Sequence, residues 1–239
     1  MSKSWVIGDV HGCDKSLKAL VEERIVPSRG DELIFLGDYI DRGPGSCQVL
    51  DYIMELEASS VNVQAIMGNH EISMIEAYHG EFNMKQSFWK KPKNHKKLAW
   101  FSYGGDKAMK SFGVEDIKDI PKHYIDWLEK LHYYILTPSF AMVHAGFNFE
   151  IDDPLEDKHA MLWIRDFKVD KDKINNRKVV HGHVPVHLDF IKECVNTSAY
   201  SFVDLDNGCV YNDRPGQGNL VAMELGSLEL KVQRNIDMD

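Results

Sequence analysis

Metal-binding residue types follow several short apolar runs of the sequence. Asp9 and His11 come directly after the run that ends at Ile7, and residues two apart in extended backbone project their side chains to the same side. Later runs are followed by four further donors, Asp38, Asn69, His144 and His183. Carboxylates, an amide and imidazoles form a mixed oxygen and nitrogen set, which suits Mn²⁺, Fe or Zn²⁺ better than Ca²⁺ or Mg²⁺. The residue types therefore predict a transition-metal site.

The number of donors and their charges indicate what this site binds. Six donors are too many for one catalytic ion with open positions, whereas two divalent ions about 3.5–4 Å apart, bridged by Asp38 and a hydroxide, use them well. Two such ions bring more positive charge than Asp9, Asp38 and a hydroxide remove, so the site stays positive. Arg42 and Arg165 would add positive charge and can grip phosphate oxygens through paired N–H donors. The charge balance predicts a phosphate ester as substrate.

His70 is the candidate general acid of such a hydrolysis, because a departing alcohol needs a proton. We expect Asp41 to accept a hydrogen bond from the other ring nitrogen of His70, which fixes the tautomer and favours the protonated imidazole. The predicted reaction is a direct, in-line attack of metal-bound hydroxide on the phosphoryl group, without a covalent phosphoenzyme.

Buried strands are expected to position these residues. The apolar runs are short, rich in β-branched or aromatic residues, and bounded by turn residues: 5–7, 33–36, 61–67, 140–143 and 178–180. The segments 15–24 and 46–57 between the first three runs carry helical periodicity. Strand, helix, strand repeats predict a largely parallel sheet, and ligands bind at the carboxyl ends of such strands.

The central part of the chain is more helical and richer in charge. We expect a helical cap-like segment at about 72–138. It includes the lysine-rich segment 85–97, which holds six lysines and no acid. Such a run is usually a solvated face, but the aromatic side chains of Phe88, Trp89 and Trp100 would also allow it to hold a nucleotide or a phosphopeptide.

The C-terminal part is predicted to contain hairpin strands. From Val195 onward, residues alternate between apolar and polar, and the turn candidates 206–208 and 213–216 interrupt the alternation. We expect these strands to end near Val232 and to form a second sheet that closes the fold.

Composition fits one globular α/β domain over residues 1–239. The chain has 44% hydrophobic and 27% charged residues and a formal net charge of −9, which argues against a nucleic-acid partner. No apolar run reaches the roughly 18 residues that span a bilayer, and no secretory pattern is seen, so no membrane partner is expected. The four cysteines form no C-x-x-C pair, and a cytoplasmic location is predicted.

Five clusters occur in order along the chain: GDVHG (8–12), GDYIDRG (37–43), GNHE (68–71), HAG (144–146) and HGHVP (181–185). Over residues 5 to about 225 the chain resembles the phosphoprotein phosphatases among the calcineurin-like metallophosphoesterases. WFSYGGDKAMKSFG (100–113) and MLWIRDF (161–167) are similar to the short bacterial and bacteriophage-type serine/threonine phosphatases. The resemblance implies an α/β fold in which a two-sheet sandwich is flanked by helices, in four layers α/β/β/α.

The resemblance also implies roles for the site residues. The first metal is then held by Asp9, His11 and Asp38. Asp38 bridges to the second metal, which Asn69, His144 and His183 complete. His70 is the acid, Asp41 its partner, and Arg42 and Arg165 bind phosphate.

Two positions near the last ligand need separate interpretation. In this subgroup the last ligand is the histidine directly after glycine, which is His183, so His181 is interpreted as a neighbour in the strand. Broader metallophosphoesterases often carry G-H-x-H, and Pro185 replaces the final histidine here. The first metal is therefore expected to have fewer protein ligands.

Three functions remain open at this point. The resemblance implies protein serine/threonine phosphatase activity, with Mn²⁺ as the expected metal and Fe or Zn²⁺ fitting the same donors. A symmetrical bis(5'-nucleosyl)-tetraphosphate hydrolase resembles the chain at nearly every cluster, and the motifs do not separate the two. The third hypothesis is a non-catalytic module that binds phosphorylated ligands, against which the full set of metal ligands and acid argues. The sequence carries no prediction of oligomeric state.

Overall fold

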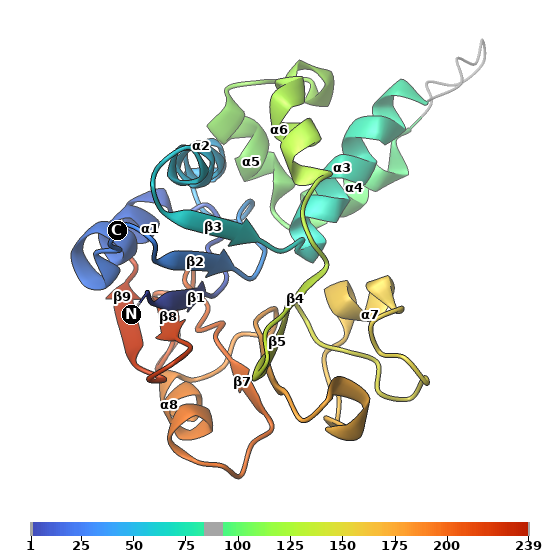
Figure 1. The fold of residues 1–239 in the computed structure, drawn as a ribbon. Coiled ribbons are helices and arrows are strands. Elements are labelled where there is room, and N and C mark those ends of the chain that lie inside the picture. The colour runs from blue at the N-terminus through green and yellow to red at the C-terminus, as the bar shows by residue number, and fades with distance from the viewer. Residues whose placement is uncertain (1, 84–92, 239) are drawn as a thin grey trace.

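Two mixed β-sheets lie at the centre of the molecule (Figure 1). In the computed structural model, which describes residues 2–83 and 93–238, the first sheet has the strand order β3-β2-β1-β8-β9 and the second the order β4-β5-β6-β7. The strands of the first sheet are β1 (Ser4–Ile7), β2 (Glu32–Phe35), β3 (Asn62–Ala65), β8 (Asn219–Glu224) and β9 (Leu230–Arg234). Those of the second are β4 (Tyr134–Leu136), β5 (Phe140–Val143), β6 (Lys178–His181) and β7 (Phe202–Asp204).

Strand alternation explains why both faces of the first sheet are buried. In β1, Trp5 and Ile7 pack into the core on the helical side, whereas Val6 packs into the core between the two sheets. β2 repeats the pattern, with Leu33 toward the helices and Ile34 toward the second sheet. Because both faces are covered, these strands are continuously apolar instead of alternating between apolar and polar residues.

Helices cover the outer faces of the sandwich (Figure 1). On the first sheet these are α1 (Asp14–Ala19), which continues as a π-helical turn (Leu20–Ile25), and α2 (Ser46–Glu57). To the right of α2 in the view lie α3 (Asn69–Phe82), α4 (His95–Ser102), α5 (Gly105–Phe112) and α6 (Lys122–Leu128), and the 3-10 turn Ile117–Asp119 precedes α6. Beside the second sheet are α7 (Lys158–Trp163), the 3-10 turn Asp172–Ile174 and α8 (Leu188–Asn196). The four-layer α/β/β/α expectation is confirmed.

The assignment of strands to sheets differs from the sequence prediction. β1, β2 and β3 are parallel as expected, but the runs at 140–143 and 178–180 belong to the second sheet. The C-terminal hairpin of β8 and β9 joins the first sheet, where β8 pairs antiparallel with β1. Leu220 to Met223 are all buried, so β8 needs cover on both faces, and the place beside β1 supplies it.

Two further expectations need correction. Val195 lies in α8 and not in a strand, and both turn candidates, 206–208 and 213–216, fall in the connection between β7 and β8. Among its described residues, the predicted cap-like segment at 72–138 contains most of α3 and all of α4, α5 and α6, and it also supplies β4, which pairs antiparallel with β5. Residues 85–92 of the lysine-rich segment lie outside the described residues.

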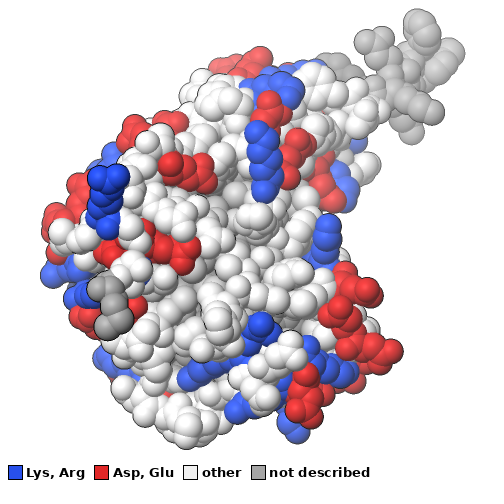
Figure 2. Space-filling model, in the orientation of Figure 1, with Lys and Arg blue, Asp and Glu red and all other residues white. Residues whose placement is uncertain are grey.

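The surface and the helices give two simple observations. On the face drawn in Figure 2, basic and acidic side chains are interspersed instead of being gathered by sign. Within residues 2–83 and 93–238, every helix is too short or too polar to cross a membrane.

Candidate dinuclear metal site

Most of the predicted site residues follow the carboxyl ends of strands in both sheets, where Asn69 and His70 begin α3, whereas Arg165 follows α7. Several of these residues have unusual backbone geometry. Of the nine non-glycine residues with positive φ in the described part of the chain, five belong to the predicted site: His11, Asp38, Asp41, Arg42 and His183. A left-handed backbone is unfavourable for such residues and concentrates at functional sites, where the surrounding structure holds it in place. The surrounding structure therefore holds the backbone in an unfavourable conformation at five of the predicted site residues.

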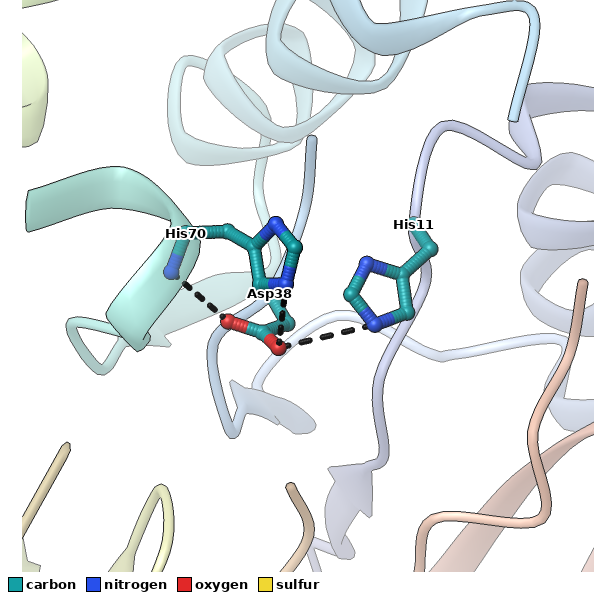
Figure 3. A group of neighbouring side chains, drawn as sticks. All are labelled: His11, Asp38 and His70. Atoms are coloured by element: carbon teal, nitrogen blue, oxygen red, sulfur yellow. Dashed lines mark hydrogen bonds and ion pairs between the residues drawn. The ribbon is translucent and has the colours of Figure 1, made fainter. Parts of the chain in front are cut away.

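Asp38 lies at the centre of the site, with imidazoles on both of its oxygens. Its Oδ2 is 3.5 Å from Nε2 of His11 and 3.7 Å from Nε2 of His70 (Figure 3). Its Oδ1 is 3.4 Å from Nε2 of His144. Two sets of potential ligand atoms lie within 4.8 Å of one another, His11–Asp38–His70 and Asp38–His144–His183. Asp38 is common to both sets, as a bridging carboxylate would be.

Hydrogen bonds to backbone carbonyls fix the tautomers of two histidines. Nδ1 of His11 lies 3.1 Å from the carbonyl oxygen of Ile40, and Nδ1 of His144 lies 3.0 Å from that of Leu36. Because a carbonyl oxygen only accepts, each Nδ1 carries the proton, and the lone pair is left on Nε2, which points into the site. Metal-binding histidines are held in this way. The donor chemistry of this structure therefore fits a metal.

The contacts of Asn69 with two histidines also fit a bound metal. Oδ1 of Asn69 lies 2.9 Å from Nε2 of His144 and 3.0 Å from Nδ1 of His183. Since Nε2 of His144 carries a lone pair, it faces the amide oxygen as a second acceptor. A cation between these atoms would remove the conflict between the two acceptors. A rotation of the amide group that turns its NH₂ group toward Nε2 of His144 would remove it as well. Asn69, His144 and His183 thus form a donor set beside Asp38.

Asp9 lies next to these clusters but belongs to neither of them. Its Oδ2 accepts a hydrogen bond of 3.1 Å from the backbone N–H of His183. Its Oδ1 is buried and has no hydrogen-bond partner among the described residues. Gly182 allows this close approach, because a Cβ at that position would lie 2.0 Å from Oδ1. An unpaired buried carboxylate oxygen is unfavourable unless a ligand satisfies it.

Burial sets the protonation states that metal binding needs. It holds the pKa of His11 well below its ordinary value, lowers the pKa of His144, and lowers the pKa of His183 to about 3. Burial also opposes ionisation of Asp38, but the surrounding imidazoles outweigh it and hold the pKa of that carboxyl below its usual range. Neutral imidazoles around a charged carboxylate are the forms that bind a cation.

His70 is connected to a buried chain of hydrogen bonds. Its Nδ1 lies 2.6 Å from Oδ2 of Asp41. Nε1 of Trp100 donates to Oδ1 and Oδ2 of Asp41, at 3.1 and 3.0 Å. Burial lowers the pKa of His70, but the charge of Asp38 and the bond to Asp41 outweigh it, so the pKa is raised. The structure thus brings Asp41 to His70 as the sequence predicted, and it adds Trp100.

Glu71 braces two of the loops at once. Its carboxylate accepts hydrogen bonds from the backbone N–H groups of Gly68, Asp38 and Tyr39, at 2.8 to 2.9 Å. Glu71 is fully buried, and burial together with the charge of Asp38 raises its pKa to about 8. Glu71 therefore connects the GNHE turn to the loop after β2.

The two predicted phosphate-binding arginines lie in different surroundings. The guanidinium of half-buried Arg42 donates to Nε2 of His11 at 2.8 Å and to Nε2 of His70 at 3.0 Å. A metal on His11 therefore requires this guanidinium to move. Arg165 is exposed, on the segment that follows α7, and its charge is one of the influences that lower the pKa of His183.

Two buried acids near the site were missed by the sequence analysis. Asp204 ends β7, and Asp206 follows it; after burial, the charge of Asp206 is the largest influence that raises the pKa of Asp9. Oδ2 of Asp206 is buried without a hydrogen-bond partner in the described part of the chain. The sequence signal was an acid directly after an apolar run, as for Asp9 and Asp38, but the DNG residues were interpreted as a hairpin turn.

Comparison with known proteins identifies the family. The family profile of the calcineurin-like phosphoesterases matches residues 2–211. The chain therefore belongs to the calcineurin-like phosphoesterase family, as the ordered clusters indicated.

Several relatives of known name match part of the chain. A symmetrical bis(5'-nucleosyl)-tetraphosphatase of Stutzerimonas stutzeri is 31% identical over 146 residues, which are 60% of this chain and 44% of that protein. The enzyme of the same name from Klebsiella pneumoniae is 39% identical over 77 residues, 32% of this chain and 26% of that protein. The matched segments thus span less than half the length of these relatives.

Solved structures share the fold at low identity. A protein serine/threonine phosphatase from Saccharomyces cerevisiae superposes with a TM-score of 0.63 at 16% identity, covering 98% of this chain and 80% of that one. A cold-active protein-tyrosine phosphatase of a psychrophilic Shewanella gives a TM-score of 0.57 at 15% identity, covering 98% and 81%. These likenesses establish the common fold.

Proposed function

We propose that this protein hydrolyses phosphate esters at a two-metal centre. The proposed ligands are Asp9, His11, Asp38, Asn69, His144 and His183, with Mn²⁺ as the expected metal and Fe or Zn²⁺ as alternatives. The observation that carries the proposal is the orientation of His11 and His144, whose Nδ1 atoms face backbone carbonyls while their Nε2 atoms face the two oxygens of Asp38. Two divalent ions, when bound, activate water and neutralise phosphoryl oxygens.

Arg42 and Arg165 are proposed to bind the phosphate oxygens. The guanidinium of Arg42 now contacts Nε2 of both His11 and His70. A phosphate that draws this guanidinium to its own oxygens releases both nitrogens, one toward a metal and the other toward the leaving group. Substrate binding to Arg42 would therefore free Nε2 of His70 to donate its proton to the leaving group.

His70 is proposed to protonate the leaving oxygen from Nε2. Asp41 holds Nδ1 at 2.6 Å, which keeps the ring oriented and its pKa raised. The value of such an acid depends on the leaving group: an alkoxide leaves poorly without a proton, whereas a phosphate or nitrophenolate leaves readily. A buried, oriented acid therefore favours an alkyl phosphate monoester, such as phosphoserine or phosphothreonine in a protein, as the first candidate substrate.

A dinucleoside tetraphosphate is the second candidate. The observation that favours it is the name shared by the sequence relatives, which match at 31% and 39% identity. Its hydrolysis breaks a phosphoanhydride bond, whose leaving group requires less help from His70.

Parallel assays with added Mn²⁺ test the function and separate the candidates. We expect turnover of p-nitrophenyl phosphate, and higher kcat/KM for a phosphoserine peptide than for diadenosine tetraphosphate. The reverse order would replace the first candidate by the second. Absence of turnover on all three substrates by the metal-loaded protein would contradict the proposed function itself.

A further inference from the structure

A cavity lies beside the proposed metal site. It has a volume of about 180 Å³ and lies between the segment that follows α7, the ends of β6 and β7, and α8. The residues that matter for its chemistry are Arg165, Phe167, His181, Phe190, Phe202 and Asp204. Sites for drug-sized ligands have volumes of about 300–1,000 Å³, so this cavity has the size for one small ring system.

Two polar side chains form the buried part of the cavity. His181 is 7% exposed and Asp204 is 3% exposed. Nδ1 of His181 lies 3.1 Å from the carbonyl oxygen of Gly182, so it carries the proton and leaves Nε2 as an acceptor. This Nε2 is buried and has no hydrogen-bond partner among residues 2–83 and 93–238. An orphaned buried acceptor is unfavourable, and a ligand or a water with a donor group would satisfy it.

Aromatic rings form the walls. The ring of His181 has its centroid 5.2 Å from that of Phe167 and 5.5 Å from that of Phe202. Phe190 extends the wall, 6.3 Å from Phe202. All three phenylalanines are partly exposed, so the wall can be reached from solvent. Aromatic side chains of this kind stack flat heterocycles.

We infer that this cavity is a nucleobase subsite that accepts adenine. The base would stack on the phenylalanine wall and donate from its exocyclic amino group to Nε2 of His181, with Asp204 beside the same edge. Hypoxanthine has a carbonyl oxygen in place of the amino group and would set an acceptor against an acceptor. The subsite therefore distinguishes adenosine from inosine.

Arg165 links the subsite to the metal centre. It is exposed and lines the cavity together with Ala145, the residue that directly follows the proposed ligand His144. A polyphosphate chain that runs past Arg165 would lead from the base to the metals. This link rests on the proposed function and deepens its second candidate, because only a nucleotide-containing substrate would use both places.

Calorimetric titration of the full-length, Mn²⁺-loaded protein with adenosine tests the subsite directly. Saturating inorganic phosphate keeps the metal centre occupied, and adenosine carries no phosphate of its own. We expect adenosine to bind, inosine to bind at least about tenfold more weakly, and Phe190→Ala to weaken adenosine about tenfold. Phe82→Ala, at a 57% exposed position on α3, is the matched control and should leave binding unchanged. Adenosine that fails to bind at millimolar concentration, or that binds equally well to Phe190→Ala, would overturn the inference and leave water as the partner of His181.

Kinetics test the link to catalysis separately. Phe190→Ala should raise KM for diadenosine tetraphosphate about tenfold and leave KM for p-nitrophenyl phosphate unchanged. Equal KM values for the dinucleotide in the variant and the parent protein would overturn the link. A protein that hydrolyses neither substrate would contradict the proposed function, while the adenosine titration would still decide on the subsite.

Discussion

The indole nitrogen of Trp100 donates hydrogen bonds to both carboxylate oxygens of Asp41, at 3.1 and 3.0 Å. Both side chains are fully buried. Gly105 packs against the indole ring, where a Cβ would lie 2.5 Å from Cδ2 of Trp100. Since Asp41 in turn holds His70, the α4 helix is connected to the predicted acid by two successive hydrogen bonds. Trp100, which is not among the predicted metal ligands, therefore helps to orient His70 through Asp41.

Trp100→Phe should lower kcat by about 10- to 100-fold and leave KM nearly unchanged, because outer partners of site residues typically have effects of this size. The variant keeps the aromatic volume and loses only the donor. Trp127→Phe is the matched control, since Nε1 of Trp127 also donates to a carboxylate, that of exposed Glu57. Equal kcat values for Trp100→Phe and Trp127→Phe would show that the hydrogen bonds from Trp100 to Asp41 do not affect proton donation by His70.

His70→Asn should have an effect that depends on the leaving group. We expect a loss of roughly 10² to 10⁴ in kcat for a phosphoserine peptide, and a smaller loss for p-nitrophenyl phosphate, whose leaving group needs no proton. His79→Asn, at a half-exposed histidine paired with Glu129, is the control. Equal losses on both substrates would remove His70 from the role of acid.

The pH profile offers a second test of His70. An acid acts in its protonated form, so kcat should fall as the pH rises through its pKa, which Asp38 and Asp41 raise against the effect of burial. This alkaline limb should be absent from the profile of His70→Asn. If the alkaline limb is unchanged in His70→Asn, the fall in kcat arises from the titration of another group and not of His70.

Asp9→Asn should raise the Mn²⁺ concentration needed for half-maximal activity by at least roughly tenfold, because the variant loses a charged donor. Equilibrium dialysis measures the Mn²⁺ affinity of the variant directly and needs no activity assay. Asp106→Asn on α5 is the control. An unchanged Mn²⁺ requirement would exclude Asp9 from the ligands, which is a sharp test because Asp9 lies outside both compact donor clusters.

Gly182→Ala should lower the free energy of unfolding by about 1–3 kcal/mol, the usual range for overpacking, and should weaken Mn²⁺ binding. The added Cβ would lie 2.0 Å from Oδ1 of Asp9, so that carboxylate must shift. Gly226→Ala is the matched control, because its nearest contact would be at 3.3 Å, with Oε1 of Glu224. Equal unfolding midpoints and Mn²⁺ affinities in the two variants would contradict the account.

The sequence sufficed to identify the strands that site residues follow, but not the sheet to which each strand belongs. Buried strands are uninterrupted apolar runs, and ligands bind at their carboxyl ends, which is why Asp38, His70 and His144 could be placed together although His144 follows a strand of the second sheet. The partner of β1 could not be predicted, because strand pairing between residues about 200 positions apart leaves no local signal. β8 was therefore assigned to the wrong sheet.

The missed side-chain contacts have a different cause. Trp100 was considered only as part of a binding surface, because nothing in its own segment shows that Asp41 accepts its proton. Asp206 was interpreted through the turn propensity of the residues around it, and only the fold shows that it is buried beside Asp9. Long-range hydrogen bonds and burial of single acids depend on packing that one sequence does not display.

The paired-metal claim is tested most directly by removing bound metal, reloading the protein with Mn²⁺, and measuring its Mn²⁺ content together with its electron paramagnetic resonance spectrum. Two ions about 3.5–4 Å apart and bridged by Asp38 should give close to two Mn²⁺ per chain and an exchange-coupled spectrum, which Asp38→Asn abolishes. A stoichiometry of one or less, or the six-line spectrum of isolated Mn²⁺ at full occupancy, would contradict it.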